Sequence, residues 1–253
     1  MKLGVSELAW SNLDKLDTLF KKFKENKITH IETVLPKHLE WNNCKSINLT
    51  KLINNYEEHN IITKSTQSIF YNSNVDSFND IKFLQHIDKV SSICKIVGIS
   101  KLVLGAPSLR KKVNLNKLYP IFLEVDTILE KNDQILLIEP NSRIYSGNFF
   151  FTLPEIIRFI KKGKFKNIKT MIDTHNVILE NEIPSDIFLK YREYVQHVHV
   201  SENELGPFKF NLKHVELAES LNKVNYNGLV IYESKPFDTL YDDIEMFSKV
   251  YGG

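Results

Sequence analysis

The sequence predicts an α/β fold of the (β/α)8 or TIM-barrel class, formed as a single domain by residues 1–253. Eight short runs of β-branched and aliphatic residues recur along the chain, separated by stretches with the apolar spacing of an amphipathic helix. Eight units of about 30 residues account for the 253 residues, and a barrel of this class typically takes about 250. Because no Gly/Ser/Pro-rich linker divides the chain, we expect one domain.

The expected strands are short and bounded by turn residues. They are Lys2–Ser6, Ile28–Val34, Ile61–Ile69, Lys101–Gly105, Ile135–Glu139, Lys169–Asp173, Val195–Val200 and Leu229–Glu233. The first helix is indicated by apolar residues that recur three or four positions apart, with lysines on the other face, namely Leu13, Leu16, Leu19, Phe20 and Phe23. Further helices are expected around residues 81–93, 118–129, 156–160, 211–217 and 240–250.

Strands that alternate with helices pair in parallel through right-handed crossovers. An open, doubly wound sheet is the alternative arrangement of such units. That class commonly carries a glycine-rich phosphate-binding turn after the first strand, and this chain has neither G-x-G-x-x-G there nor a P-loop elsewhere. The sequence therefore favours the closed barrel.

Composition excludes several classes of function. The chain has 33 basic and 31 acidic residues, a net charge of +2, which gives no electrostatic reason to expect a nucleic-acid or membrane partner. Cys44 and Cys94 have no Cys or His neighbours at metal-binding spacing, so neither a disulfide scaffold nor a structural zinc site is expected. No stretch reaches the roughly 20 apolar residues of a membrane span, and Glu7 comes too early for a secretory signal. We expect a soluble, cytoplasmic protein.

Four ionisable residues lie at or near the ends of the last four expected strands: Glu139, Asp173, His199 and Glu233. In a barrel these ends meet at one mouth, the face that carries active sites in this fold. Three carboxylates and one imidazole suit a divalent cation such as Mn²⁺, Mg²⁺, Co²⁺ or Zn²⁺, and without one the carboxylates would raise each other's pKa. A strand-end carboxylate taken singly is more often a loop anchor or helix cap. Four consecutive strands with the same feature favour one metal ion.

Longer motifs surround these positions. They are Glu139-Pro140-Asn141, the segments Tyr145–Phe149 and His197–Glu202, and Tyr226–Glu233. With them the sequence resembles the xylose isomerase-like (β/α)8 superfamily of sugar isomerases and epimerases, most clearly over residues 134–235. In that superfamily a Glu, Asp, His and Glu at the ends of strands five to eight bind one divalent metal ion, and Glu139, Asp173, His199 and Glu233 match them.

The resemblance implies a metal-dependent isomerase or epimerase of a sugar, a sugar phosphate or a related polyol ketone. Its chemistry would be abstraction of the proton next to a carbonyl through a metal-stabilised enediolate. By the same resemblance Glu139 and Glu233 form the acid/base pair, while Asp173 and His199 mainly hold the metal. A small carbohydrate is the expected partner, and a homo-oligomer is consistent with the dimers and tetramers common among similar proteins.

Five further residues are candidates for substrate binding: His175, Glu32, Gln67, Arg110 and Tyr145. Arg110 follows the fourth strand, where it would meet a phosphate or carboxylate of the substrate, or else lie on a basic surface. His175 follows Asp173 one residue earlier than the Asp-x-x-His common in the family. The chain also lacks the Arg that the epimerases carry after the metal-binding His. The missing Arg weakens the case for a simple 3-epimerase of free ketoses.

Three rival functions remain. A lyase of the inosose dehydratase type shares the fold and the metal site, and the sequence does not separate it from an epimerase. The apurinic-site endonucleases need extra ligands, mostly histidines, at the ends of strands two to four, where this chain offers Glu32, Gln67-Ser68 and Gly105, and they would favour a basic excess. A non-catalytic sugar-binding barrel would have no need for the full set of four metal ligands.

Overall fold

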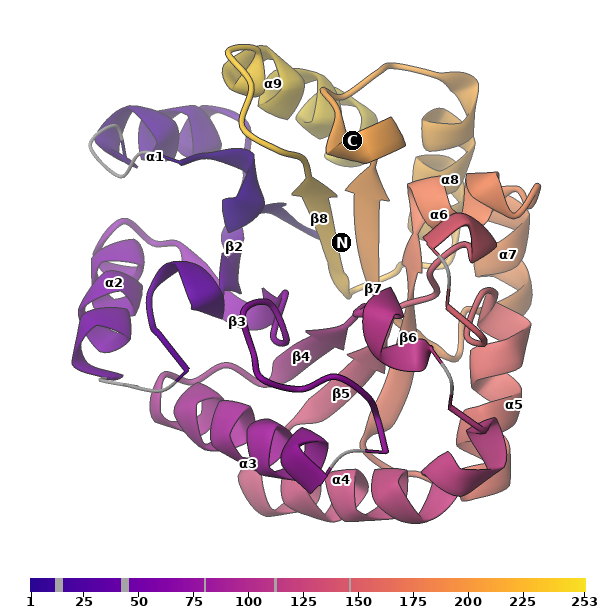
Figure 1. Ribbon diagram of the computed structural model, residues 1–253. Helices are drawn as coiled ribbons and strands as arrows, with labels where there is room; N and C mark the ends of the chain where they lie inside the picture. The colour runs from indigo at the N-terminus through magenta and orange to yellow at the C-terminus, as the bar shows by residue number, and fades with distance from the viewer. Residues whose placement is uncertain (12–15, 42–45, 80, 112, 146) are drawn as a thin grey trace.

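The computed structural model describes residues 1–11, 16–41, 46–79, 81–111, 113–145 and 147–253. Eight parallel strands form a closed barrel in the order of the sequence (Figure 1). They are β1 (Lys2–Ser6), β2 (His30–Val34), β3 (Ile62–Gln67), β4 (Lys101–Leu104), β5 (Ile135–Ile138), β6 (Ile168–Asp173), β7 (Val195–Ser201) and β8 (Leu229–Glu233). The predicted barrel class is confirmed, and each predicted strand is present with its ends shifted by at most two residues.

The barrel closes where β1 pairs in parallel with β8, from Lys2 opposite Leu229 to Val5 opposite Tyr232. This pairing excludes the open sheet. On the other side of β8, Ser201 of β7 lies opposite Glu233, and Asp173 of β6 lies opposite His199. The register therefore brings the polar ends of β6, β7 and β8 to one level of the barrel.

Helices surround the barrel (Figure 1). They are α1 (Leu16–Glu25), α2 (Ser46–Glu58), α3 (Ile81–Ile96), α4 (Leu118–Asn132), α5 (Leu153–Gly163), α6 (Thr174–Leu179), α7 (Pro184–Tyr191), α8 (Leu212–Lys223) and α9 (Leu240–Tyr251). The helix α5 shows how the sequence specifies them: a proline and Glu155 stand in its first turn, and lysines in its last, as the helix dipole favours. Among the predicted positions, Leu13 and Cys44 lie outside the described residues.

Short 3-10 helices lie between the longer elements. They are η1 (Glu7–Ala9), η3 (Leu35–Lys37), η4 (Pro107–Arg110), η5 (Leu115–Lys117), η6 (Arg143–Tyr145) and η7 (Asn203–Leu205). Each of them lies in a connection that leaves the carboxyl end of a strand, and η4 and η5 share the connection between β4 and α4. In the part of the chain that the structure describes, no helix is both long and apolar enough to cross a membrane.

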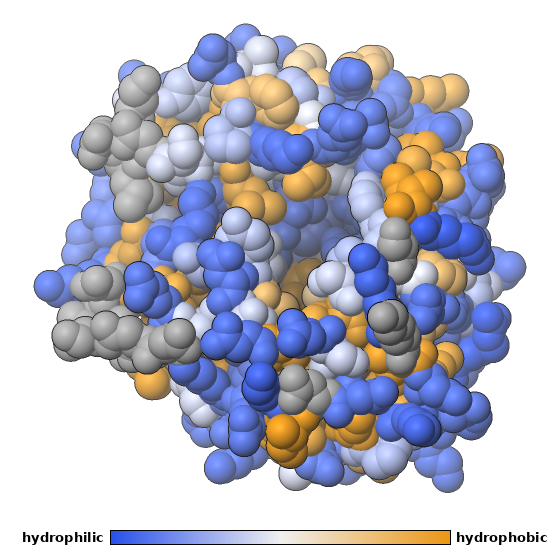
Figure 2. Space-filling model, viewed as in Figure 1, coloured by the Kyte–Doolittle hydropathy of each residue, from blue (hydrophilic) through white to orange (hydrophobic). Residues whose placement is uncertain are grey.

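The core has two parts, because side chains of a strand point alternately inward and outward. Most apolar residues pack between the barrel and its helices, whereas Val103, Leu137 and Met171 form a separate cluster from neighbouring strands. We assign this small cluster to the barrel interior. Glu139 and Asp173 follow Leu137 and Met171 by two positions, so they point inward one layer higher. The face seen in Figure 2 is hollowed near its centre, with mostly hydrophilic side chains around the hollow.

Candidate metal and substrate site

The four ligand candidates predicted from the sequence come together at the mouth of the barrel. Glu139 follows β5, Asp173 and Glu233 end β6 and β8, and His199 lies inside β7. One ligand atom from each of the four lies within 4.8 Å of the others. His199 Nδ1 is 3.0 Å from Glu139 Oε1 and 3.1 Å from Glu233 Oε2. A ring nitrogen and two carboxylates thus face one point from three strands.

Asp173 is held in place by hydrogen bonds to both of its carboxylate oxygens. Oδ1 accepts from the backbone N–H of Asn176 at 2.7 Å and from its side-chain Nδ2 at 2.8 Å. Oδ2 accepts from Ser201 Oγ at 2.6 Å. The residue is therefore the N-cap of α6 as well as a member of the ligand set.

The electrostatics of the cluster match a cation site. Burial and the charges of Glu139 and Glu233 raise the pKa of Asp173 to about 7. Burial also raises the pKa of Glu233, against the opposing effect of His199. Several carboxylates held together at low dielectric carry negative charge that a divalent cation neutralises, and carboxylate with imidazole is a donor set that Mn²⁺, Co²⁺ and Zn²⁺ accept. The four residues fit a divalent ion.

Burial disfavours the charged form of His199, but the charges of Glu32 and Glu233 outweigh it and raise the pKa of His199 well above its usual value. The imidazolium would place a proton on Nδ1, between the carboxylates of Glu139 and Glu233. A bound cation at this point would take the place of that proton, because a ligating histidine must be neutral.

Two cavities meet at the cluster, and both have Glu139, Glu233 and Leu205 in their walls. The first, of about 390 Å³, is lined by Asp173 and by polar residues that include Asn141, Ser201 and Lys235. The second, of about 510 Å³, extends toward the segment after β3, and its wall includes Ile69, Phe70, Val75, Val103 and Leu109. The volumes are in the range of small-molecule sites.

Three of the five predicted substrate residues line these cavities. His175 and Tyr145 lie in the wall of the first cavity, and Gln67 in the wall of the second. The Nε2 atom of His175 is buried, and no hydrogen-bond partner for it is found among the described residues. Burial raises the pKa of the Tyr145 hydroxyl, as do the charges of Asp173 and Glu139, which places this hydroxyl near the ligand set.

The structure places the other two predicted residues elsewhere. Arg110 is fully buried at the end of η4, and its guanidinium donates to the backbone carbonyls of Phe150, Gly105 and Glu139. It lines neither cavity, so it is neither an anion-binding residue at the mouth nor part of a basic surface. Glu32 is also fully buried and lines neither cavity, because its side chain points into the barrel toward His199. We do not carry these two residues into the substrate site.

Sequence reasoning assigns no role to several residues of the site, among them Asn176, Ser201, Lys235 and His197. A signal for two of them is present in the strand Val195–Ser201. Side chains two positions apart share one face of a strand, so His197 and Ser201 point inward with His199. Nothing local marks Asn176 or Lys235, because their positions depend on how the connections after the strands fold.

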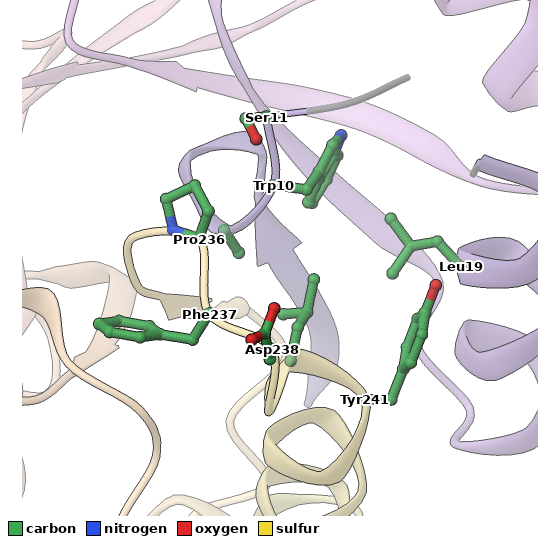
Figure 3. A pocket seen from close by; sticks show the side chains of 9 residues that line it. Trp10, Ser11, Leu19, Pro236, Phe237, Asp238 and Tyr241 are labelled. Carbon is green, nitrogen blue, oxygen red and sulfur yellow. The ribbon is translucent and has the colours of Figure 1, made fainter. Parts of the chain in front are cut away.

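A further cavity, of about 430 Å³, lies beside the first connection of the barrel (Figure 3). Trp10, Leu19, Phe237 and Tyr241 line it, with Asp238 as the one carboxylate of its wall among the described residues. It shares no described lining residue with the two cavities at the ligand cluster. A single carboxylate offers no pair of carboxyl groups for acid/base chemistry, in contrast to the cluster of Glu139, Asp173 and Glu233.

A sequence profile described as xylose isomerase-like TIM barrel matches residues 20–250. The chain belongs to this family. The predicted resemblance is thereby confirmed, and the barrel architecture of the family agrees with the closed barrel seen here.

Two sugar epimerases are similar to part of this sequence. A D-psicose 3-epimerase of Enterocloster bolteae is 30% identical over 111 residues, which are 44% of this chain and 36% of that protein. A 3-dehydro-D-guloside 4-epimerase of Escherichia coli is 24% identical over 112 residues, 44% of this chain and 42% of that protein. The matched stretches thus cover well under half of each relative.

Solved structures of similar proteins superpose over nearly the whole chain. A 3-keto-D-glucoside 4-epimerase from E. coli gives a TM-score of 0.77 at 18% identity, covering 99% of this chain and 98% of that chain. A D-psicose 3-epimerase from Clostridium cellulolyticum gives 0.74 at 18% identity, covering 100% and 92%. At this level of identity the superpositions establish the fold.

Proposed function

We propose that this protein is a divalent-metal-dependent isomerase or epimerase of a carbohydrate, acting by proton transfer at a carbon next to a carbonyl. The observation that carries the proposal is that Glu139 and Glu233 stand in the walls of both cavities, beside Asp173 and His199. Two carboxylates from different strands beside one bound sugar supply a base and an acid. The activities of the epimerases to which the chain is similar support the same chemistry.

Each residue of the cluster has a distinct task in this proposal. Asp173 and His199 hold the ion, and Asp173 is oriented for this by Asn176 and Ser201. One of Glu139 and Glu233 takes the proton from the carbon, and the other returns a proton to complete the reaction. When bound, the ion supplies positive charge that polarises the substrate carbonyl and stabilises a developing enediolate.

The walls of the cavities favour a neutral sugar over a sugar phosphate. Lys235 is the only lysine or arginine among the described lining residues, whereas Glu202 and Glu204 line the same cavity. Arg110 is occupied by backbone carbonyls and is not available to an anion. In this proposal His175, Tyr145 and Gln67, which line the cavities, exchange hydrogen bonds with hydroxyl groups of the sugar.

The test is exchange of substrate hydrogen in D₂O, followed by NMR. Ketoses, 3-keto-glycosides, inososes and their phosphates would be incubated with the Mn²⁺-loaded protein. We expect deuterium at the carbon next to the carbonyl, together with an epimer or isomer and no dehydrated product. A product that has lost water would instead establish a dehydratase.

The matched variants are Glu139→Gln and Glu233→Gln, with Glu219→Gln on the exposed face of α8 as the control. Loss of a general acid or base lowers kcat by about 10²–10⁴-fold, so we expect this loss in the first two variants and ordinary activity in the control. Ordinary turnover in both site variants would contradict the assignment.

A further inference from the structure

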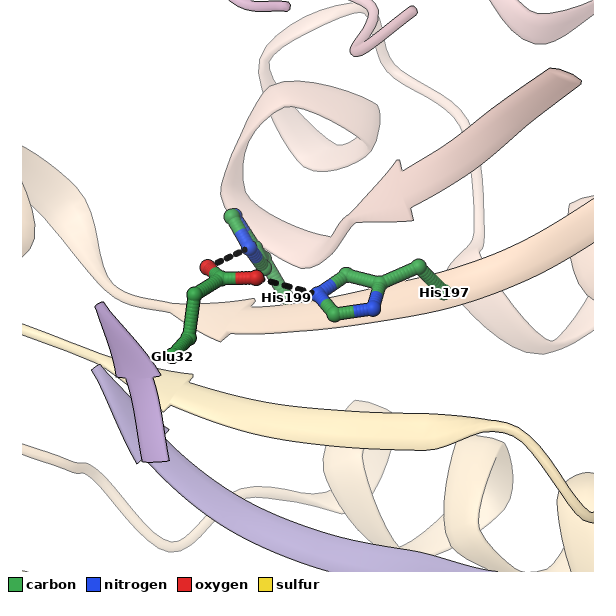
Figure 4. Close-up of side chains that lie close together, drawn as sticks. All are labelled: Glu32, His197 and His199. Atoms are coloured by element: carbon green, nitrogen blue, oxygen red, sulfur yellow. Dashed lines mark hydrogen bonds and ion pairs between the residues drawn. The ribbon is translucent and has the colours of Figure 1, made fainter. Parts of the chain in front are cut away.

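Glu32 lies beneath the ligand cluster, in the interior of the barrel. Its Oε1 atom is 2.7 Å from His199 Nε2, and its Oε2 atom is 2.9 Å from His197 Nε2 (Figure 4). The side chains of all three residues are fully buried. Glu32 comes from β2 and the histidines from β7, strands that are not neighbours in the barrel. The contact therefore crosses the interior, and it has no part in pairing adjacent strands.

The two nitrogens of His199 face different groups. Nδ1 faces Glu139 and Glu233 at the mouth, and Nε2 faces Glu32 below. A neutral imidazole has one N–H and one lone pair. Carboxylates only accept, so Glu32 favours a proton on Nε2, and Glu139 and Glu233 favour one on Nδ1 when no ion is bound. Because a ligating histidine must be neutral, the proton on Nε2 is the one that stays when an ion binds at the cluster. The lone pair is then on Nδ1 and points at the ligand cluster.

His197 keeps Glu32 in this position. Its Nε2 atom faces the second oxygen of the same carboxylate, so each oxygen of Glu32 meets one histidine. Because His197 and His199 are two positions apart on β7, the strand itself fixes the spacing of the two rings. The hydrogen bond between Oε1 and His199 and the close contact between Oε2 and the buried ring of His197 together limit rotation of the carboxylate.

We propose that Glu32 is a positioning residue of the metal centre. It fixes the tautomer and the ring orientation of His199 and so raises the affinity of the site for its ion, as carboxylates behind ligating histidines do. Glu32 touches neither the substrate nor the ion. This inference rests on the proposed metal centre, and the experiment is designed to separate the failure of one from the failure of the other.

The test compares the dissociation constant for Mn²⁺, measured by calorimetric titration, in the unaltered protein, Glu32→Gln and Glu7→Gln. Glu7 is the matched control: it is a buried carboxylate that also meets a histidine, with Oε2 at 2.8 Å from His38 Nε2, but it does not touch His199. We expect affinity to fall about 10–100-fold in Glu32→Gln and to stay unchanged in Glu7→Gln.

A second measurement reads the tautomer directly. In the Zn²⁺-loaded protein, ¹⁵N NMR of labelled histidines is expected to show a proton on His199 Nε2, and in Glu32→Gln this signal is expected to shift or exchange faster. Thermal unfolding of each variant shows whether it folds. If Glu32→Gln proves unstable, His197→Gln is measured in its place. We expect a smaller loss of Mn²⁺ affinity in this variant, because Glu32 then keeps only its contact with His199.

The outcomes separate the two proposals. If the unaltered protein binds no divalent ion, the proposed metal centre fails. If it binds one ion and Glu32→Gln binds it equally well, the centre stands and the positioning role of Glu32 is wrong. Two ions per chain, the second lost in Glu32→Gln, would make Glu32, His197 and His199 a metal site of their own and would likewise overturn the inference.

Discussion

At the scale of single residues, Asp173 at the end of β6 and Arg110 at the end of η4 are both buried and both held by hydrogen bonds with backbone groups. Asp173 is the N-cap of α6 and also lies in the cluster that could hold an ion, so capping a helix does not remove a strand-end carboxylate from such a cluster. Arg110 looks like a residue of an exposed basic segment, because Lys111 and a further lysine follow it. Ala106, in the left-handed conformation with φ of 45°, precedes η4. Arg110, the last residue of η4, is buried and not exposed. The pattern of the sequence does not predict this turn.

The burial of Arg110 leads to a prediction about stability. Replacing it by Met removes the guanidinium donor from the carbonyls of Gly105 and Glu139 and one of the two donors of the Phe150 carbonyl, and we expect the free energy of unfolding to fall by about 3 kcal/mol. The matched substitution at exposed Arg158 of α5 should cost under about 0.5 kcal/mol. Urea unfolding of both variants checks this. Equal losses would mean that the buried guanidinium adds nothing.

At the scale of elements, the strands are predictable and the connections are not. Period-two alternation predicts which residues of β5, β6, β7 and β8 point inward, and the inward residues at or near the carboxyl end of each strand lie close to the mouth. For this reason the strand pattern alone identifies Glu139, Asp173, His199 and Glu233 as a group. The connections after the strands place Tyr145, His175 and Lys235, and no periodic signal marks these segments.

The end of β4 offers a test of how closely neighbouring strands pack at the mouth. A Cβ atom added to Gly105 would lie 2.6 Å from Glu139 Oε2, closer than contacts of this kind allow. Since the carboxylate is the far end of a flexible side chain, we expect Gly105→Ala to fold but to displace Glu139 and weaken Mn²⁺ binding about tenfold or more. Gly147→Ala is the control, because its Cβ would meet Arg110 at an ordinary 3.6 Å. Unchanged Mn²⁺ affinity in Gly105→Ala would contradict this packing.

At the scale of the whole molecule, contacts across the barrel interior join residues far apart in sequence. Glu32 and His199 are 167 positions apart, and only closure of the barrel brings them together. The sequence predicts the barrel from repeated local patterns, each of which is read within about 30 residues. A contact between strands that are not neighbours produces no local pattern in the sequence. From the sequence Glu32 is expected at a strand end in contact with a substrate, whereas it lies inside β2 and its side chain meets two histidines.

The stability of the folded barrel also depends on pH through His30 of β2. Burial lowers the pKa of His30 to about 4, with further effects from Lys2 and Lys101. In the unfolded chain histidine titrates near about 6.5, so below that pH the unfolded state binds more protons and the folded state loses stability as pH falls. At pH 5 we expect this residue alone to cost about 2 kcal/mol. The loss of unfolding free energy between pH 7 and pH 5 should therefore be smaller in His30→Gln than in the unaltered protein, by about that amount. An equal loss in both proteins would contradict the lowered pKa of His30.

The most direct test of the account is the number of divalent ions that the purified protein binds. Titration with Mn²⁺ should give one ion per chain in the unaltered protein and no binding of comparable affinity in Glu139→Ala or His199→Ala. Both variants remove a ligand from the cluster whose donor atoms lie within 4.8 Å of one another. No ion in the unaltered protein, or full binding in both variants, would contradict the metal centre and leave a barrel without the proposed chemistry.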